Sequence, residues 1–530
     1  MKRLAATSIV ACSTLVLAAC SSGGTSAGNG AVVSGATFTM ATAGDPGSLD
    51  PSTAVQGNTN LLLSFAYDTL VHTDQNNNIV SGLATKWSVT PNAVTFTLHQ
   101  GATCSDGSAV TPDVVAKSVN HTVDPKTKSP IVGVLVPADV KATGDNAKGT
   151  VTLRTKKPSQ FLLQSAVAIF IVCGKGLDDP KTLAGKTSGS GPYELTDSVQ
   201  GDHYTLVARK GYTWGPGGSG TGDKGVPAKV VLKIVANEST SANLLLGGQL
   251  NAGIYTGADR RRVEHAPGVL TSTLPDGNGE FFFNQNGGRP GADPAVRQAL
   301  ARAVDLDQLA KVDTQATGKK STGMTTLSPR PCKVDSVSGH RPSYDPAAAQ
   351  AALDAAGWKA GPDGVRAKNG KRLSIRVVYD NDFGPGTQAG AEFMADAWKK
   401  IGVAVDLKGM ADAAWNDVIF KSGDWDVSEV PIGVSLPSQL LAYLSGPTVP
   451  KGTNFAGIHN DRYDKLTAQA ATGSVANGAC TTWAQAESAL FDDYDVVPVA
   501  ERTQLVASKN AKVVIPGGLA QPTMFRMLKG

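Results

Sequence analysis

The side chains that could support catalysis in this chain are scattered and form no recognisable constellation. The 530 residues include seven histidines, and none has the His-Glu-x-x-His spacing that places two zinc ligands on one face of a helix. The adjacent carboxylates Asp492 and Asp493 would diverge on a helix instead of sharing a proton. We expect Trp358, Trp398 and Trp483 to be core residues and not a platform for substrate. The sequence therefore names no nucleophile, base or metal site.

Two short motifs resemble functional loops but lack their context. Residues 24–28 read G-T-S-A-G, the pattern of a hydrolase nucleophile, which needs a strand before it and a helix after it. Neither is predicted there. Residues 74–85 begin like a calcium-binding loop, but Ile79 and Thr85 stand where that loop needs Gly and Glu. A solvated turn is the better interpretation, and we expect no metal and no cofactor.

Four cysteines, after the two near the amino terminus, could form disulfides. They are Cys104, Cys173, Cys332 and Cys480. Their even number is typical of an exported chain, and none of them has the close spacing of zinc ligands, which is the competing interpretation. Three pairings remain open from the residues alone.

The amino terminus resembles a bacterial lipoprotein signal. Lys2 and Arg3 precede an apolar run, and Leu17-Ala18-Ala19-Cys20 resembles the lipobox. The resemblance implies that residues 1–19 are removed and that Cys20 carries lipid, which would anchor the chain to the cell membrane. The alternatives are an ordinary secretory signal or a buried helix. Residues 20–35 are rich in Gly and Ser and predict a flexible tether.

Composition limits the classes of partner and the number of domains. The 49 basic and 45 acidic residues nearly cancel, and no basic stripe is present, so we expect no nucleic acid. A chain of this length is too long for one hydrophobic core, which predicts at least two domains.

Segments with strand and helix patterns alternate along the chain, which predicts an α/β fold. Thr111 and Pro112 are typical of the cap and first residue of a helix, and Gly357 ends an Ala-rich helix. The predicted strands are 37–41, 94–98, 150–155, 204–209 and 373–379, and the predicted helices are 112–119, 296–304 and 347–356.

A series of segments, in order and spacing, resembles the extracytoplasmic solute-binding proteins of peptide and nickel ABC importers, the family of the oligopeptide- and dipeptide-binding proteins. The resemblance covers roughly residues 36–515. The segments are LDP (49–51), YDTLVHTDQNNNIVSGLATKW (67–87), SDGSAVTPDVVAKS (105–118), GSGPYEL (189–195), FNQNGGRPGADPAVRQALARAVD (283–305), AALDAAGWKAGPDGVRAKNGKRL (351–373) and NFAGIHNDRYDKL (454–466).

The resemblance implies a two-lobed fold of the periplasmic-binding-protein type (type II, cluster C) with a hinge and a central ligand cleft. Lobe I would comprise residues 36–283 and 500–530, with an extra subdomain at about 80–200, and lobe II residues 284–499. We favour the pairs Cys104–Cys173 and Cys332–Cys480, because each then lies within one lobe.

The function implied by the resemblance is solute capture and not catalysis. The protein would close around a peptide or peptide-like solute and deliver it to the ABC permease subunits in the membrane, and we expect it to act as a monomer. A siderophore-like compound, a sugar or an opine is the alternative solute. A lipid-anchored hydrolase is a distant alternative without a catalytic group to support it.

Seven residues are predicted to bind the ligand. Gln56, Asn58 and Thr59 match a family loop that faces the cleft, and Asp45 lies in the turn before it. Tyr255 follows a segment that resembles the crossing between lobes, although Asn251 replaces its acidic residue. Trp415 precedes the strand that leads to the pocket. The seven are Asp45, Gln56, Asn58, Thr59, Tyr255, Trp415 and Ser435.

Ser435 marks a departure from the family. Peptide-binding members carry an Asp at this position, and its carboxylate holds the α-amino group of the peptide. Without that carboxylate, either Glu429 or Asp382 substitutes for it or the ligand lacks a free amino terminus, because a buried ammonium without a counter-charge is costly. Blocked or cyclic peptides, siderophore-like compounds and sugars then become candidates, and nickel is disfavoured by the absence of a His cluster.

Overall fold

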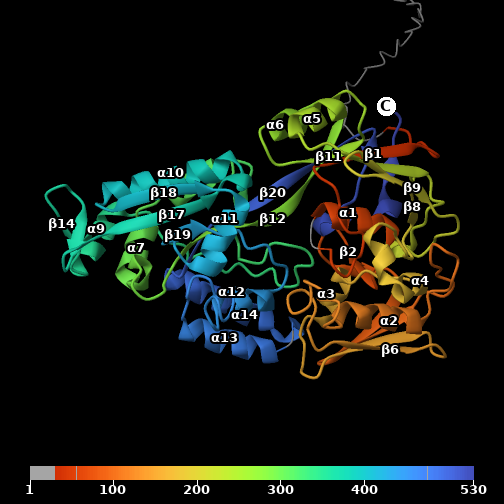
Figure 1. Ribbon diagram of the computed structural model, residues 1–530, viewed down its shortest axis with the longest axis horizontal. Coiled ribbons are helices and arrows are strands. Elements are labelled where there is room, and N and C mark those ends of the chain that lie inside the picture. Colours follow the sequence, from red (N-terminus) through yellow and green to blue (C-terminus); the bar gives the residue numbers. More distant parts are fainter. Residues whose placement is uncertain (1–29, 55–56, 474) are drawn as a thin grey trace, which may run out of the picture.

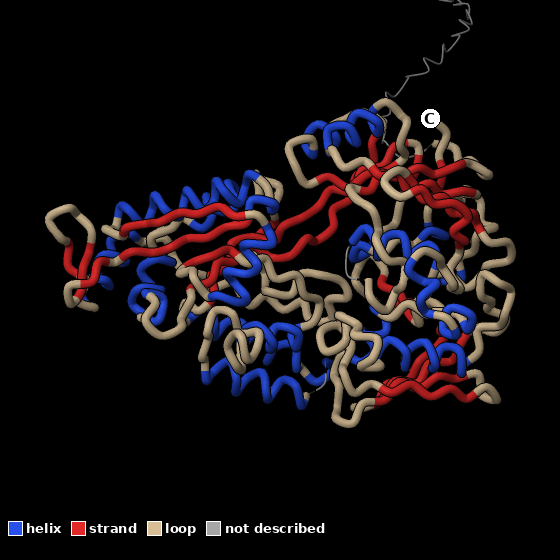
Figure 2. The backbone as a smooth tube through the Cα atoms, viewed as in Figure 1, coloured by secondary structure: helices blue, strands red, loops and turns tan. Residues whose placement is uncertain are grey.

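The computed structural model describes residues 30–54, 57–473 and 475–530, and it consists of two bodies joined by a pair of long strands (Figure 1). We call the body built from residues 30–268 and 510–530 lobe I, and the body built from residues 284–495 lobe II. Figure 2 shows that strands run from one body into the other without a break in the sheet. That sheet has eleven strands in the order β18-β17-β19-β12-β20-β11-β1-β10-β9-β8, with β13 paired to β20.

Strands β12 (Val269–Phe283) and β20 (Val496–Lys509) make the connection between the lobes. They are antiparallel, from Val269 opposite Lys509 to Phe282 opposite Val496. At one end β20 pairs with β11 of lobe I, and at the other end β12 pairs with β19 of lobe II. The register shifts near Gly277, so the ladder is irregular between the two lobes although pairing continues on both sides.

Lobe I is built around the helix α1 (Gly57–Ala66), whose second half is buried on all sides. Leu61, Leu62, Leu63 and Phe65 of this helix are buried, because it packs between the sheet and the carboxyl-terminal segment. The other principal elements of the lobe are β1 (Thr37–Thr42), β8 (Tyr193–Val199), β9 (His203–Ala208), β10 (Lys229–Ile234), β11 (Ala252–Tyr255), α5 (Glu238–Leu246), α6 (Arg260–Glu264), β21 (Ala511–Lys512) and β22 (Arg526–Met527).

A smaller sheet, in the order β4-β5-β7-β6, lies under α2 within lobe I (Figure 1). The predicted cap of α2 is confirmed, since the Thr111 hydroxyl accepts from Val114 N at 3.3 Å and Pro112 is the first residue of the helix. The elements of this region are β2 (Val71–Thr73), β3 (Ile79–Ser81), β4 (Ala84–Thr90), β5 (Ala93–Leu98), α2 (Pro112–Val123), β6 (Lys141–Asp145), β7 (Thr150–Arg154), α3 (Leu162–Ser165) and α4 (Gly174–Asp178).

Lobe II packs helices on a short parallel sheet of β17, β18 and β19. The indole of Trp398 is buried and donates to Leu300 O at 2.8 Å, which fixes α10 against α7. The elements of this lobe are α7 (Pro294–Arg302), α8 (Leu306–Asp313), β13 (Lys319–Lys320), α9 (Pro346–Ala355), β14 (Lys359–Ala360), β15 (Arg366–Lys368), β16 (Lys371–Arg372), β17 (Ser374–Asp380), α10 (Pro385–Lys400), β18 (Ala404–Met410), α11 (Asp412–Asp417), β19 (Val427–Glu429), α12 (Leu441–Leu444), α13 (Asp461–Thr472) and α14 (Ala479–Asp492).

The predicted tether reaches too far into the folded protein. Val33 N donates to Met527 O at 2.9 Å, and Lys529 N donates to Ala31 O at 2.8 Å. Residues 30–35 therefore pair with the carboxyl-terminal segment, and the prediction of a free coil up to residue 35 was wrong. The Gly- and Ser-rich composition predicted a coil, but the backbone of this segment is held by hydrogen bonds to the carboxyl-terminal segment, which composition does not reveal. The rest of the tether and Cys20 lie outside the described residues.

Two disulfides join Cys104 to Cys173 and Cys332 to Cys480, the pairing that the sequence analysis favoured. The segment at Asp74 that resembles the start of a calcium-binding loop forms a turn. The Asp74 carboxylate accepts from Asn76 N at 2.8 Å and from Asn78 N at 2.9 Å. Across the described part of the chain, no helix is both long and apolar enough to cross a bilayer.

Candidate functional site

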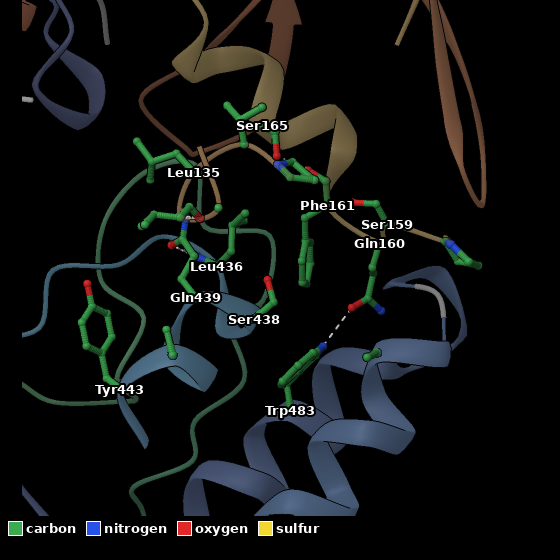
Figure 3. A pocket seen from close by; sticks show the side chains of 17 residues that line it. Leu135, Ser159, Gln160, Phe161, Ser165, Leu436, Ser438, Gln439, Tyr443 and Trp483 are labelled. Carbon is green, nitrogen blue, oxygen red and sulfur yellow. Dashed lines mark hydrogen bonds between the residues drawn. The ribbon is translucent and has the colours of Figure 1, made fainter. Parts of the chain in front are cut away.

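Two adjoining cavities lie between the lobes. The first, which we call the aromatic chamber, has a volume of about 280 Å³ and is lined by residues from both lobes (Figure 3). The aromatic residues that line it are Phe161, Tyr443 and Trp483. The second, which we call the amide chamber, has a volume of about 380 Å³ and is lined in part by Asn60 and Gln164.

The chambers share one wall, to which both lobes contribute. Its residues are Val134, Leu135 and Ser165 from lobe I, and Leu436 and Gln439 from lobe II. Because each chamber has walls on both lobes, a solute in either one would contact both bodies at once.

Gln439 bridges the lobes at this shared wall. Its Oε1 accepts from Ser435 N at 2.9 Å and from Leu436 N at 3.0 Å, which closes the turn that Pro437 begins. Its Nε2 donates across the cleft to Val134 O at 3.1 Å. One buried amide thus shapes the pocket loop and connects it to the opposite lobe.

Gln160 makes a second bridge at the edge of the aromatic chamber. Its Oε1 accepts from Trp483 Nε1 at 2.9 Å, and its Nε2 donates to Gly473 O at 3.1 Å (Figure 3). Beside it, Phe161 of lobe I packs with Trp483 and with Cys332 of the second disulfide. Trp483 was predicted to be a core residue, and it is 2% exposed, but it also lines the cleft.

The chamber walls are uncharged. Among the described residues, none of those lining either chamber is Asp, Glu, Lys, Arg or His. Polarity comes from amides, hydroxyls and the backbone. Within the amide chamber, the buried Oε1 of Gln164 has no hydrogen-bond partner among the described residues.

Ser435 lies where the sequence analysis expected it, in the wall of the amide chamber. It is 7% exposed, and its hydroxyl lies 3.4 Å from Gln439 Oε1. The short hydroxyl leaves no charge at this point of the cleft.

The other predicted ligand residues of lobe I do not line the two chambers. Asp45 accepts from Gly201 N at 2.6 Å and from the Tyr204 hydroxyl, so its carboxylate holds a loop. The buried Thr59 hydroxyl donates to Pro46 O. Asn58 lines a separate cavity of about 360 Å³, which lies between lobe I and the connecting strands β12 and β20. That these three residues bind ligand stays a prediction, and Gln56 lies outside the described residues.

The two predicted aromatic ligands belong to the cores of the lobes. Tyr255 is fully buried in β11, and its hydroxyl lies 3.2 Å from Ser241 Oγ. Trp415 is 3% exposed and donates from Nε1 to Ser428 Oγ at 3.1 Å. Neither ring lines one of the two chambers, and both contribute apolar area to the cores.

Neither proposed substitute for the missing carboxylate lines a chamber. Glu429 lies 2.6 Å from Arg502 Nη2, and this guanidinium also bonds Asp313 at 2.7 Å. Burial raises the pKa of Glu429 to about 8. Asp382 accepts from Asp412 N at 3.1 Å on the surface of lobe II. The described residues thus place no ionised anchor in the interlobe cavities.

No motif in the sequence marks the three glutamines that shape the cleft. Gln160, Gln164 and Gln439 lie in loops or at short helical turns, where Gln is common. Only Ser-Leu-Pro at 435–437 predicts a turn there, and it does not predict a contact with the other lobe.

The chain is similar to a known protein family over most of its length. The family described as "Bacterial extracellular solute-binding proteins, family 5 Middle" matches residues 78–448. The chain belongs to the family 5 bacterial extracellular solute-binding proteins. It is accordingly a solute-binding protein of the kind that serves ABC importers of the peptide and nickel type.

Individual relatives agree with this assignment over most of the chain. The periplasmic murein peptide-binding protein MppA of Escherichia coli strain K12 is 27% identical over 491 residues, which cover 87% of this chain and 86% of the relative. The Dipeptide-binding protein of the same organism is 23% identical over 461 residues, covering 80% of this chain and 81% of the relative.

Solved structures have the same two-lobed α/β fold. A substrate-binding protein from Microbacterium hydrocarbonoxydans, in complex with 4-hydroxybenzoate hydrazide, is 27% identical, with a TM-score of 0.71 and coverage of 93% of this chain and 100% of that chain. The ABC transporter substrate-binding protein CtaP from Listeria monocytogenes is 20% identical, with a TM-score of 0.79 and the same coverages. The predicted fold class is confirmed.

Proposed function

We propose that this protein is the lipid-anchored solute receptor of an ABC importer, and that it captures a peptide or peptide-like solute in the two chambers between its lobes. The observation that carries the proposal is the shared wall of the chambers, where Gln439 of lobe II donates to Val134 of lobe I. A solute bound there adds contacts to both lobes, which are the contacts that a receptor needs in order to signal occupancy.

Capture is a change in the populations of open and closed forms. A solute that contacts both lobes stabilises the closed form, and only by the contacts that it makes better there. Strands β12 and β20 are the proposed hinge. The boundaries predicted from the resemblance, 36–283 with 500–530 and 284–499, fall at or within these strands, which supports the proposal that the two bodies move about this connection.

A non-peptide solute is the second candidate. The uncharged walls of both chambers favour it, because they offer no partner to the ionised ends of a free peptide. The relative from Microbacterium hydrocarbonoxydans was solved with an aromatic hydrazide, which supports a small organic solute in this fold.

Native mass spectrometry of protein purified without denaturation tests the proposal. We expect a retained solute, and we expect solution scattering to give a smaller radius of gyration with that solute than after its removal by unfolding and refolding. A protein that carries no solute, and whose scattering profile is unchanged by an extract of its growth medium, would contradict receptor function.

A further inference from the structure

We propose that the solute of the interlobe cleft is uncharged and combines an aromatic or apolar group with an amide-type hydrogen-bond donor. This inference deepens the proposed function and rests on it. It follows from three features of the two chambers: the absence of charge among the described lining residues, one unmatched acceptor, and the rings that line the aromatic chamber.

Charged residues that lie near the chamber walls in sequence do not line the chambers. Arg330 follows the wall residue Pro329, and its Nη2 donates to Thr322 Oγ1 at 3.1 Å. Asp50 precedes the wall residue Pro51, and its carboxylate accepts from Ser52 N at 2.9 Å and from Ser52 Oγ at 2.6 Å. Lys333 donates to Asn76 O at 2.6 Å. An ion transferred from water into these chambers would find no counter-charge on the described walls, so its desolvation would be uncompensated.

Gln164, which lines the amide chamber, has one buried acceptor without a donor among the described residues. The acceptor capacity of Gln439 Oε1 is taken up by Ser435 N and Leu436 N, and its Nε2 is directed to Val134 O. Gln164 Oε1 is buried without a partner among the described residues. A buried acceptor without a donor is costly, so a solute N–H or O–H at this atom would be favoured.

The aromatic chamber offers ring and aliphatic surface on the other side of the shared wall. Phe161 and Trp483 border it from opposite lobes, with Leu135 and Leu436 beside them (Figure 3). The indole N–H of Trp483 is already donated to Gln160. The polar capacity of this tryptophan is thus satisfied, and what it offers a solute is apolar surface.

A matched set of three probes tests the charge of the solute. Benzamide, benzoate and benzylamine share one ring and differ at neutral pH in being neutral, anionic and cationic. By titration calorimetry with solute-free protein, we expect benzamide to bind at least about tenfold more tightly than either ion. The Ser435→Asp variant should bind benzamide more weakly and benzylamine more tightly than the unmodified protein does, because the new carboxylate has a partner only in the cation. Ser198→Asp, which adds the same charge on exposed β8, should leave all three affinities unchanged.

A second variant tests the unmatched acceptor. Gln164→Met keeps the approximate volume of the side chain and removes the amide oxygen. We expect this variant to bind benzamide several-fold more weakly than the unmodified protein does. Its affinity for N,N-dimethylbenzamide, which has no N–H, should be unchanged.

Each outcome decides the inference. Equal or tighter binding of benzoate or benzylamine by the unmodified protein would overturn it, and so would a failure of all three probes to bind. If Ser435→Asp does not fold, the probe ranking on the unmodified protein and on Gln164→Met still decides. A protein that retains a charged solute in native mass spectrometry would refute this inference and leave receptor function intact.

Discussion

At the scale of single residues, the amide of Gln439 has two separable roles. Its oxygen organises the loop at Ser435 and Leu436, and its nitrogen reaches the opposite lobe at Val134 O. A carboxylate at this position could still accept from the loop but could not donate across the cleft. One substitution, Gln439→Glu, should therefore keep the first role and remove the second.

Gln439→Glu should loosen the closed form without unfolding the loop. Repulsion between the new carboxylate and Val134 O replaces a hydrogen bond, so we expect affinity for the retained solute to fall about tenfold, equivalent to about 1.4 kcal/mol. The radius of gyration with solute should rise toward that of the solute-free protein. Gln469→Glu, which makes the same change on the exposed side of α13, is the control. Unchanged affinity in Gln439→Glu would show that this bridge does not contribute to closure.

The buried carboxyl of Glu429 should make stability depend on pH. Burial raises its pKa from 4.5 to about 8, so the folded protein holds a proton there that the unfolded chain releases above pH 4.5. The associated stability is fully present below about pH 4.5 and is lost as the pH rises through about 8. We expect Glu429→Gln, which mimics the protonated form, to gain at least about 1 kcal/mol relative to the unmodified protein between pH 5 and 9.

Urea unfolding at a series of pH values measures this difference. Glu392→Gln removes an exposed carboxylate from α10 and should keep the pH profile of the unmodified protein. Parallel profiles for Glu429→Gln and the unmodified protein would show that Glu429 is ionised in the folded state near neutral pH, held so by Arg502.

At the scale of elements, the irregular part of β12 lies between the lobes. Gly277 has a φ of +106°, which L side chains rarely adopt, and it faces Gly433 of the pocket loop. The space around it would admit a methyl group, since the nearest atom to an added Cβ is 3.8 Å away. The constraint on this residue is therefore in its backbone conformation.

Gly277→Ala should lower the free energy of unfolding by about 1–3 kcal/mol because of backbone strain. Gly222→Ala adds the same methyl group at an exposed position with open space and no positive φ, and we expect it to change stability by less than about 0.5 kcal/mol. Chemical denaturation of both variants provides the comparison. Equal stabilities would indicate that β12 relaxes at this point without cost.

Local patterns predicted elements well and contacts between lobes poorly. The strand at 150–155 and the helix at 296–304 are present within two residues as β7 and α7, because their periodicity is a local property. Strand β12 was not predicted, since Pro275 and the glycines near it interrupt its pattern. Ser435 was placed in the cleft through family resemblance, whereas the contacts of Gln160 and Gln439 with the opposite lobe are made to partners more than 300 residues away.

At the scale of the whole molecule, the proposed attachment to the membrane would depend on Cys20. Cys20→Ser should prevent lipid transfer and release the protein into the periplasm or medium, because the thiol that accepts the lipid is gone. Cys12→Ser lies in the segment expected to be removed and should leave the protein attached. Fractionation of cells followed by immunoblotting distinguishes the two variants. Retention of Cys20→Ser in the membrane fraction would contradict the anchor.

The pairing of the two chain ends has a mechanical consequence for a tethered receptor. Val32 and Leu528 form a bridge, with backbone hydrogen bonds on both sides of it, and both segments belong to lobe I. Tension that arrives along the amino-terminal chain is therefore borne by lobe I alone, and neither β12 nor β20 lies in the loaded path. A pull from the membrane should leave the angle between the lobes unaltered, so a surface-held receptor should bind its solute as tightly as one in free solution.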